Sequence, residues 1–177
     1  WVDGAKEALA YAYGKGYDLI VVTNQSGVAR GYYKESDVQI LHDHMAHELD
    51  RSGAPILHFY YCPHHKEGSV PLYAVDCECR KPKPGMVNQA IKDYDVDPKS
   101  SFLIGDSQRD VDAAEAAGSA DSGFYPCGRT DGKQSGCFSE RKIPDGTFLW
   151  RDRTDTCCKE VILDNRRGTG TAVFHGI

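Results

Sequence analysis

The sequence predicts an α/β fold of the doubly wound, Rossmann-like kind, in which helices cover both faces of a mostly parallel sheet. Short apolar runs alternate along the chain with segments of helical periodicity, and this alternation is typical of βαβ units. Residues 19–22 are apolar at every position, as expected for a strand that is buried on both faces. Polar motifs also follow two predicted strands directly, which is where such sheets bind ligands.

The first half of the chain contains four predicted elements. Residues 4–14 are rich in good helix formers, and the glycines that follow favour a helix end. A strand over 17–22 then ends in a polar loop. Ser36 can cap a second helix, whose apolar residues recur every three or four positions up to Leu49. Residues 56–61 form the next predicted strand, because they are rich in aromatic and apolar side chains.

The second half begins with a loop over residues 62–85, rich in cysteine, histidine, proline and glycine. Residues 86–94 are expected to be a helix, and residues 101–106 a strand that ends in an acid. A last helical face runs up to Gly118. Because parallel strands are joined by right-handed crossovers, the loops that follow all these strands should lie at one edge of the sheet.

Two regions follow from this pattern. Residues 1–118 are predicted to form the α/β core, including the cysteine-rich loop. Residues 119–177 form an atypical C-terminal region, in which periodicity fades and only residues 160–163 look like a strand.

Charge and cysteine content exclude several classes of protein. The 177 residues carry 21 Lys and Arg against 26 Asp and Glu, a net charge of -5, which excludes a generally basic nucleic-acid binder. No apolar run reaches the roughly 18 residues that a membrane span needs. The seven cysteines are an odd number, and the clustering of three of them between Cys62 and Cys79 favours a metal over disulfides. The other four, Cys127, Cys137, Cys157 and Cys158, show no ligand spacing and favour free thiols in a reducing compartment, so we expect a cytoplasmic protein.

A metal-ligand pattern interrupts the long loop. Cys62 and His64 lie two residues apart, and Cys77 and Cys79 repeat that spacing after a dozen residues. Three thiolates and one imidazole complete the tetrahedral shell of Zn²⁺ and leave no open position, so the expected site is structural. His65 has a supporting or solvent-facing role in this interpretation, and coincidental clustering is the alternative.

Three further segments have the chemistry of a phosphate site. Residues 23–27 offer a hydroxyl, an amide and backbone donors at a strand end, although a plain turn would look the same. Arg80 and Lys81 open a basic, proline-stiffened segment that suits an anion or, alternatively, a solvated turn. Asp106 at a strand tip, with Asp110 four residues on, is an arrangement that binds Mg²⁺, helix capping by Asp106 being the alternative.

In this order the motifs resemble the haloacid dehalogenase (HAD) superfamily of phosphatases. The zinc pattern is similar to the branch that holds D-glycero-D-manno-heptose-1,7-bisphosphate 7-phosphatase and histidinol-phosphatase. The resemblance covers about residues 1–118 and lies in LIVVTNQSGVARG (19–31), YCPHHKEGSVPLYAVDCECRKPKPGM (61–86) and FLIGDSQRDVDAAEAAG (102–118). The implied fold is therefore the HAD sheet with a zinc-stabilised loop.

The resemblance implies Mg²⁺-dependent hydrolysis of a phosphomonoester through an aspartyl-phosphate intermediate. The implied substrate is D-glycero-D-manno-heptose 1,7-bisphosphate, a precursor of lipopolysaccharide, and the implied reaction removes its 7-phosphate. The implied substrate-binding residues are Thr23, Asn24, Gln25, Ser26, Arg80 and Lys81, of which Thr23, Arg80 and Lys81 are also implied in catalysis. The implied metal ligands are Cys62, His64, Cys77 and Cys79 for zinc and Asp106 for magnesium.

Two features depart from the family pattern. Ser107 stands where the heptose enzymes usually carry Lys, which removes one local cation. The nucleophile motif, an apolar strand followed by Asp-x-Asp-Gly-Thr or Val, is absent. Because the chain opens on Trp1, we expect a sequence that lacks its first strand and is itself inactive. In a circularly permuted chain Asp164 would be a candidate nucleophile, although Arg166 then stands where the acid/base belongs.

Three functions remain open from the sequence. The first is a sugar-phosphate phosphatase, with histidinol-phosphatase as the alternative on the same scaffold. The second is a non-catalytic zinc module that binds a partner or nucleic acid, and the third is an inactive phosphate-binding remnant. The first predicts a monomer whose partner is a small phosphorylated substrate, with no nucleic acid and no membrane.

Overall fold

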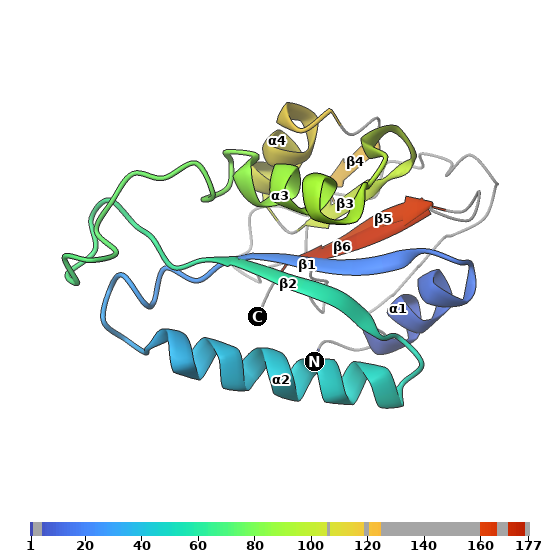
Figure 1. The fold of residues 1–177 in the computed structure, drawn as a ribbon, viewed down its shortest axis with the longest axis horizontal. Coiled ribbons are helices and arrows are strands. Elements are labelled where there is room, and N and C mark those ends of the chain that lie inside the picture. The colour runs from blue at the N-terminus through green and yellow to red at the C-terminus, as the bar shows by residue number, and fades with distance from the viewer. Residues whose placement is uncertain (2–4, 106, 119–120, 125–159, 166–169, 176–177) are drawn as a thin grey trace, which may run out of the picture.

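A computed structural model confirms the predicted α/β fold. It describes residues 1, 5–105, 107–118, 121–124, 160–165 and 170–175. A sheet with the strand order β2-β1-β5-β6-β3-β4 has α1 and α2 on one face and α3 and α4 on the other (Figure 1). The elements are α1 (Ala5–Gly14), β1 (Asp18–Asn24), α2 (Glu35–Arg51), β2 (Ile56–Cys62), α3 (Gly85–Tyr94), a 3₁₀ turn (Pro98–Ser100), β3 (Phe102–Gly105), α4 (Gln108–Ala116), β4 (Asp121–Phe124), β5 (Glu160–Asn165) and β6 (Gly170–His175).

The sheet is mostly parallel, as predicted. β1 pairs in parallel with β2 and β6, and β3 pairs in parallel with β4 and β6, whereas β5 runs antiparallel to β1 and β6. β5 and β6 come from the region beyond residue 118 and join the same sheet as the core strands. Within the described part of the chain, no helix combines the length and apolar character required to cross a membrane.

Strand β1 lies at the centre of two hydrophobic cores. Ile20 and Val22 pack on the face of α3 and α4, and Leu19 and Val21 pack on the face of α1 and α2. All four side chains are at most 2% exposed. An unbroken apolar run is what a strand covered on both faces requires, so this packing explains why β1 lacks the polar alternation of a half-exposed strand.

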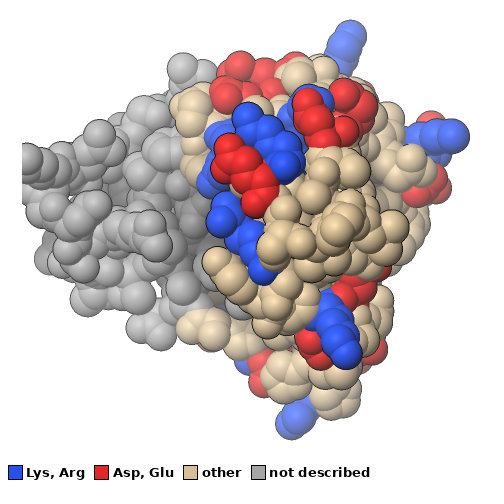
Figure 2. All heavy atoms as spheres, turned by 90° about the vertical axis from the view of Figure 1, so that its left-hand side faces the viewer, with Lys and Arg blue, Asp and Glu red and all other residues tan. Residues whose placement is uncertain are grey.

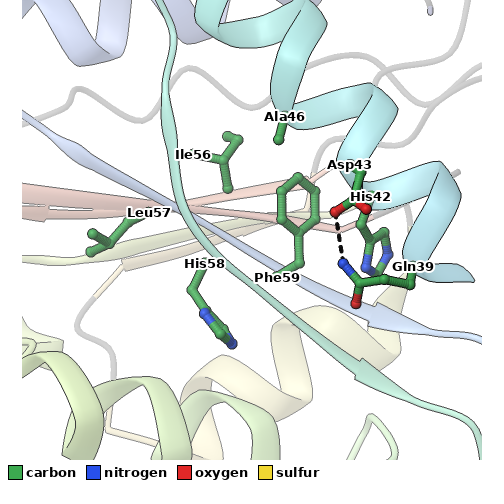
Figure 3. Close-up of a pocket in the computed structure, with 8 residues that line it drawn as sticks. All are labelled: Gln39, His42, Asp43, Ala46, Ile56, Leu57, His58 and Phe59. Carbon is green, nitrogen blue, oxygen red and sulfur yellow. Dashed lines mark hydrogen bonds between the residues drawn. The ribbon is translucent and has the colours of Figure 1, made fainter.

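Helix α2 turns a face that contains a histidine towards β2. The His42 side chain is 4% exposed and its ring stacks on Phe59, with 4.7 Å between the ring centroids (Figure 3). Tyr61 meets the same ring edge-on at 5.6 Å. Burial lowers the pKa of His42, with the His58 charge adding to this and Asp43 opposing it. The neutral imidazole is therefore the form that the folded chain accommodates.

The buried histidine makes stability depend on pH. Because the pKa of His42 is lower in the folded chain than in the unfolded chain, protonation favours unfolding as the pH falls below about 6.5. We expect the free energy of unfolding, measured with urea at pH 7.5 and pH 5, to fall less in His42→Gln than in the parent chain. His44→Gln, at a side chain that is 65% exposed, is the control and should leave the fall unchanged. An equal fall in all three chains would contradict this account.

Candidate active site and metal centre

The ends of β1 and β2 bring the polar loop and the metal-ligand motif side by side. Asn24, the last residue of β1, is the register partner of Cys62, the last residue of β2. Immediately beyond them, the Gln25 backbone amide donates to the Cys62 carbonyl at 2.8 Å. β1 extends two residues further than the sequence predicts, because Thr23 and Asn24 continue the pairing with β2. The two motifs are therefore joined by backbone hydrogen bonds.

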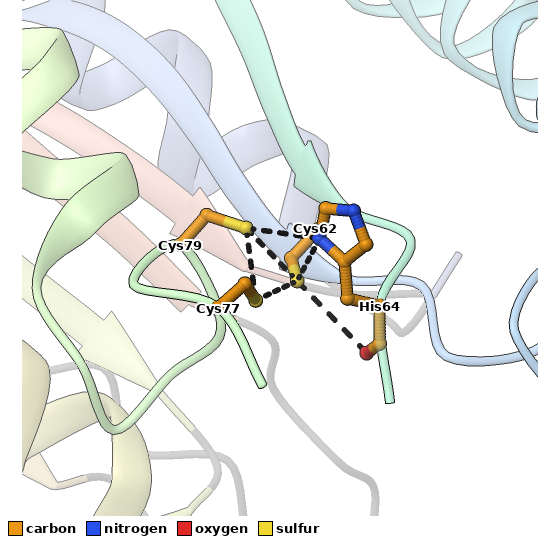
Figure 4. A group of neighbouring side chains, drawn as sticks. All are labelled: Cys62, His64, Cys77 and Cys79. Carbon is orange, nitrogen blue, oxygen red and sulfur yellow. Dashed lines mark hydrogen bonds between the residues drawn. The ribbon is translucent and has the colours of Figure 1, made fainter. Parts of the chain in front are cut away.

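The four predicted zinc ligands form one cluster (Figure 4). The ligand atoms of Cys62, His64, Cys77 and Cys79 all lie within 4.8 Å of one another. The Sγ atoms of Cys79 and Cys62 are 3.2 Å apart, as are those of Cys79 and Cys77, and Cys62 and Cys77 are separated by 3.5 Å. The His64 Nδ1 atom lies 3.4 Å from Cys79 Sγ and 3.8 Å from Cys62 Sγ.

These separations fit a tetrahedral zinc ion. With Zn–S bonds of about 2.3 Å, the corners of a tetrahedron are about 3.8 Å apart, close to the spacing of the cluster. The donor set of three thiols and one imidazole is also the one that structural zinc sites use. Burial is uneven, since Cys62 is buried and the other three residues are half-buried. The cluster therefore has a geometry that fits a closed structural site, in which His64 would bind through Nδ1, the ring atom that faces the thiols.

The three thiols differ in acidity. The hydrogen bond with Cys62, more than any other contact, lowers the pKa of Cys79 to about 5. The same hydrogen bond, followed by burial, raises the pKa of Cys62 above its usual range. Burial is the main cause of the raised pKa of Cys77. At neutral pH the metal-free cluster thus contains one thiolate, and the other two thiols have to lose protons to bind a metal ion.

The loop that carries the zinc ligands also docks on the loop after β1. The Ala29 amide donates to the Pro63 carbonyl at 3.1 Å, and the Val70 amide donates to the Ala29 carbonyl at 2.9 Å. The Arg30 guanidinium lies 3.1 Å from His65 Nε2, which places His65 on the outer side of the cluster. Order imposed on this loop by a metal would therefore extend to the segment that follows Thr23.

Lys81 enters the core from the same loop. Its side chain is 1% exposed, and its Nζ atom donates to the Val22 carbonyl at 3.1 Å and to Asp110 Oδ1 at 2.8 Å. Asp110, in the first turn of α4, is equally buried and also accepts from the Ser107 amide at 3.0 Å. The sequence pattern marks Asp110 only as a second acid and does not predict this ion pair. The Ser-x-x-Asp capping pattern was the one local signal for its orientation.

The side-chain amide of Asn24 is hydrogen-bonded to the backbone of Lys81 and is not turned towards a substrate position. Asn24 Nδ2 donates to the Lys81 carbonyl at 3.1 Å, and Asn24 Oδ1 accepts from the Lys81 amide at 3.1 Å. Both polar ends of the side chain are occupied, so Asn24 fixes the position of Lys81 relative to β1. The expectation that the Asn24 side chain contacts a phosphoryl group stays a prediction, and these contacts do not support it.

The other predicted substrate residues surround the same strand end. Thr23 and Gln25 are 2% and 6% exposed and are hydrogen-bonded to each other at 3.3 Å. Ser26 is half-buried, and its carbonyl accepts from the Arg30 amide at 3.0 Å. Arg80 donates to the His64 carbonyl at 3.2 Å, which places it against the metal cluster. The structure thus brings the polar loop, Lys81 and the zinc ligands together.

Two predicted residues are not part of this arrangement. Asp106 lies outside the described residues, although the N-cap of α4 is Ser107, which removes the alternative that Asp106 serves as that cap. Asp164 is in β5, which runs antiparallel to β1 with Asp164 opposite Asp18. Thr23 is five residues further along β1, about 16 Å away. The register therefore puts Asp164 at the far end of the sheet, and this corrects its candidacy as a nucleophile next to Thr23.

The face that contains the zinc loop carries charges of both signs. Figure 2 looks onto this side of the molecule and shows Lys and Arg side chains interleaved with Asp and Glu. Lys83 of the predicted basic segment is paired with Asp76 at 2.9 Å and with Glu78 at 3.0 Å. Nucleic-acid binding requires a basic stripe or patch. On the visible face the cations lie among acids, and Lys83 is paired with two of them.

Comparison with known proteins identifies related chains. The model of the HAD-hydrolase-like family matches residues 78–139. A D-glycero-beta-D-manno-heptose-1,7-bisphosphate 7-phosphatase from Pasteurella multocida is 41% identical over 148 residues, which cover 82% of this chain and 80% of the relative. A D-glycero-alpha-D-manno-heptose-1,7-bisphosphate 7-phosphatase from Photorhabdus laumondii is 50% identical over 103 residues, 58% of this chain.

One similar solved structure is the D,D-heptose 1.7-bisphosphate phosphatase from B. bronchiseptica, complexed with magnesium and phosphate. It is 33% identical with a TM-score of 0.57, and the match covers 70% of this chain and 63% of that chain. The chain spans 56% of the length of the Photorhabdus laumondii relative and 66% of that of a second relative, from Rhodopseudomonas palustris. The 33% sequence identity to the solved structure is higher than two chains need to share a fold.

Proposed function

Because this chain belongs to the D-glycero-D-manno-heptose-1,7-bisphosphate 7-phosphatase family of HAD-like hydrolases, we propose that the protein hydrolyses a sugar phosphate. The proposed reaction removes the 7-phosphate of D-glycero-D-manno-heptose 1,7-bisphosphate. The names of the relatives support this substrate over histidinol phosphate, which is the alternative on the same scaffold.

The observation that carries the proposal is the convergence of Thr23 and Lys81 at the end of β1. Phosphoryl transfer depends on positioning and on offsetting the charge of the transferred group. An ammonium group held in a dry site by Asp110 and the Val22 carbonyl is a preorganised positive charge for this purpose. The Thr23 hydroxyl supplies a hydrogen-bond donor on the neighbouring residue of the strand. Arg80, which directly precedes Lys81 in the loop, is proposed to bind the sugar part of the substrate.

Two metal ions have separate roles in this proposal. Zinc, held by Cys62, His64, Cys77 and Cys79, is structural, since four protein ligands leave no position for substrate. Magnesium would be bound by Asp106 and by phosphate oxygens, and it supplies further charge neutralisation. The magnesium and phosphate in the related B. bronchiseptica enzyme support this assignment. A monomer in the cytoplasm, where thiols stay reduced, remains our expectation for the protein.

Phosphate release tests the proposal. The 177 residues contain no Asp-x-Asp-Gly-Thr motif after an apolar strand, so we expect the chain alone to release little or no phosphate. An added N-terminal strand ending in that motif should restore release from D-glycero-D-manno-heptose 1,7-bisphosphate. Lys81→Met in the extended chain should then lower kcat/KM by about 10²-fold or more.

The competing functions give different results in the same assay. Release from histidinol phosphate alone would favour the alternative phosphatase. Turnover by the chain without the added strand would contradict the proposal that the reaction needs a nucleophile motif which these 177 residues do not contain. If neither chain releases phosphate but the chain binds DNA or RNA in a salt-sensitive manner, the binding-module function replaces the phosphatase.

A further inference from the structure

A chain of hydrogen bonds runs from Tyr33, which is 38% exposed, inwards to the buried Thr23 hydroxyl. The Tyr33 hydroxyl donates to Gln25 Oε1 at 2.7 Å, and Gln25 Nε2 donates to Thr23 Oγ1 at 3.3 Å. The Gln25 side chain is 6% exposed and Thr23 is 2% exposed, so neither is a surface group that happens to meet a neighbour. The Gln25 amide is used at both ends by protein atoms.

The direction of these bonds determines what Thr23 can do. A threonine hydroxyl has one hydrogen to donate and accepts through its lone pairs. Because Thr23 Oγ1 already accepts from Gln25, its hydrogen remains to be donated. Among the residues that the structure describes, no acceptor takes that hydrogen. A buried donor without an acceptor is costly unless a ligand supplies one, and a phosphoryl oxygen is such an acceptor.

Tyr33 favours one direction of this chain. A glutamine amide can turn by half a rotation, and Gln25 would then present its oxygen to Thr23 and take up the hydroxyl hydrogen. The turned amide would have to donate to the Tyr33 oxygen, but the 2.7 Å contact between Tyr33 and Gln25 is the usual length of an O–H···O bond and shorter than a typical N–H···O bond, so it favours the orientation in which Tyr33 donates to Oε1 and the Thr23 hydrogen stays available. Gly27 makes this contact possible, because a Cβ atom at position 27 would overlap the Tyr33 ring.

We propose that Gln25 is a positioning residue, held by Tyr33, which aims the hydroxyl hydrogen of Thr23 at a bound phosphoryl group. The sequence resemblance implied that Gln25 contacts the substrate. In this proposal Gln25 instead acts through Thr23. The inference rests on the proposed function, since it requires that a phosphate group occupies the end of β1.

A double-mutant cycle on the 177-residue chain tests this, with inorganic phosphate as the probe and calorimetry as the measurement. Thr23→Val, which removes the donor, should weaken phosphate binding by about tenfold. In the chain that keeps Thr23, Tyr33→Phe should weaken phosphate binding by about three- to tenfold, because the side-chain amide of Gln25 is then free to turn. In the Thr23→Val background Tyr33→Phe should have no effect, since the group it acts through is gone.

Tyr32→Phe is the matched control. It removes a hydroxyl of the same kind from the neighbouring residue, whose side chain is 75% exposed. It should leave phosphate binding unchanged. Gly27→Ala is a second route to the same result and should repeat the loss seen in Tyr33→Phe, because it displaces the ring.

The outcomes separate this inference from the proposed function. If Thr23→Val weakens binding while Tyr33→Phe has no effect, or has the same effect in both backgrounds, the relay is wrong and the phosphate site stands. If the parent chain does not bind phosphate, or Thr23→Val binds it equally well, the proposed site at the end of β1 fails, and this inference fails with it.

Discussion

Replacing Asp110 by Asn is expected to lower the free energy of unfolding by about 3–5 kcal/mol. The substitution keeps the shape of the side chain and an oxygen that can accept from the Ser107 amide, so the helix cap survives. What it removes is the negative charge 2.8 Å from Lys81 Nζ, at a pair in which both side chains are 1% exposed. An ammonium group whose counter-charge is lost at that depth has no water to replace it. Denaturant unfolding measures the loss.

Two further variants separate the ion pair from other causes. Lys81→Met combined with Asp110→Asn should be more stable than Asp110→Asn alone, because no unpaired charge remains buried. Lys83→Met removes a lysine two residues away whose side chain is 37% exposed and paired with exposed acids, and it should change stability far less. A loss below about 1 kcal/mol in Asp110→Asn would show that the pair is open to solvent.

Removing zinc is expected to have the second large effect. At a free zinc concentration a thousand times Kd, bound metal stabilises the folded chain by about 4 kcal/mol, and a chelator should remove that amount. Residues 62–79 should then become sensitive to protease, since apolar side chains of this loop such as Leu72 and Val75 are exposed and do not anchor it in the core. His64→Gln should abolish tight zinc binding, whereas His65→Gln, at the adjacent residue that contacts Arg30, should not. Equal zinc affinity in both variants would contradict the assigned ligand set.

The protonation of the cluster gives this prediction a pH dependence. Cys79 has a pKa of about 5 and would meet a zinc ion as a thiolate at pH 7, whereas Cys62 and Cys77 have raised pKa values. Binding at pH 7 should therefore release about two protons, and the affinity should fall as the pH is lowered. Calorimetric titration in buffers of different ionisation enthalpy counts the protons. A release close to zero would mean that the thiols are already deprotonated before the metal binds.

The sequence predicts the core elements well where local pattern and tertiary environment agree. The apolar run at 19–22 is β1, and the three- and four-residue spacing up to Leu49 is α2. β4 and β6 were not predicted, because both lie in the region beyond residue 118, where the sequence has no clear periodicity. The antiparallel direction of β5 has no local signal either, since an apolar strand reads the same in both directions.

The candidate site shows the same division at the level of single side chains. The clustering of Cys62, His64, Cys77 and Cys79 was predictable because the identity and spacing of these residues alone restrict the chemistry. The partners of Asn24, Gln25 and Lys81 were not, because each depends on a contact that only the folded chain creates. Asn24 contacts the backbone of Lys81, which lies 57 positions later in the sequence. The resemblance implied that Asn24 binds substrate, and it gave no indication of this contact.

The cysteine-rich loop also restricts which changes of chain length the protein can accept. Lys81 follows Cys79 by two positions and is gripped by Asn24, which is in turn in register with Cys62. An insertion of one residue between Cys79 and Lys81 would shift the ammonium group by about 3.5 Å with no slack to absorb it. Evolutionary insertions and deletions should therefore be rare between Cys79 and Lys81.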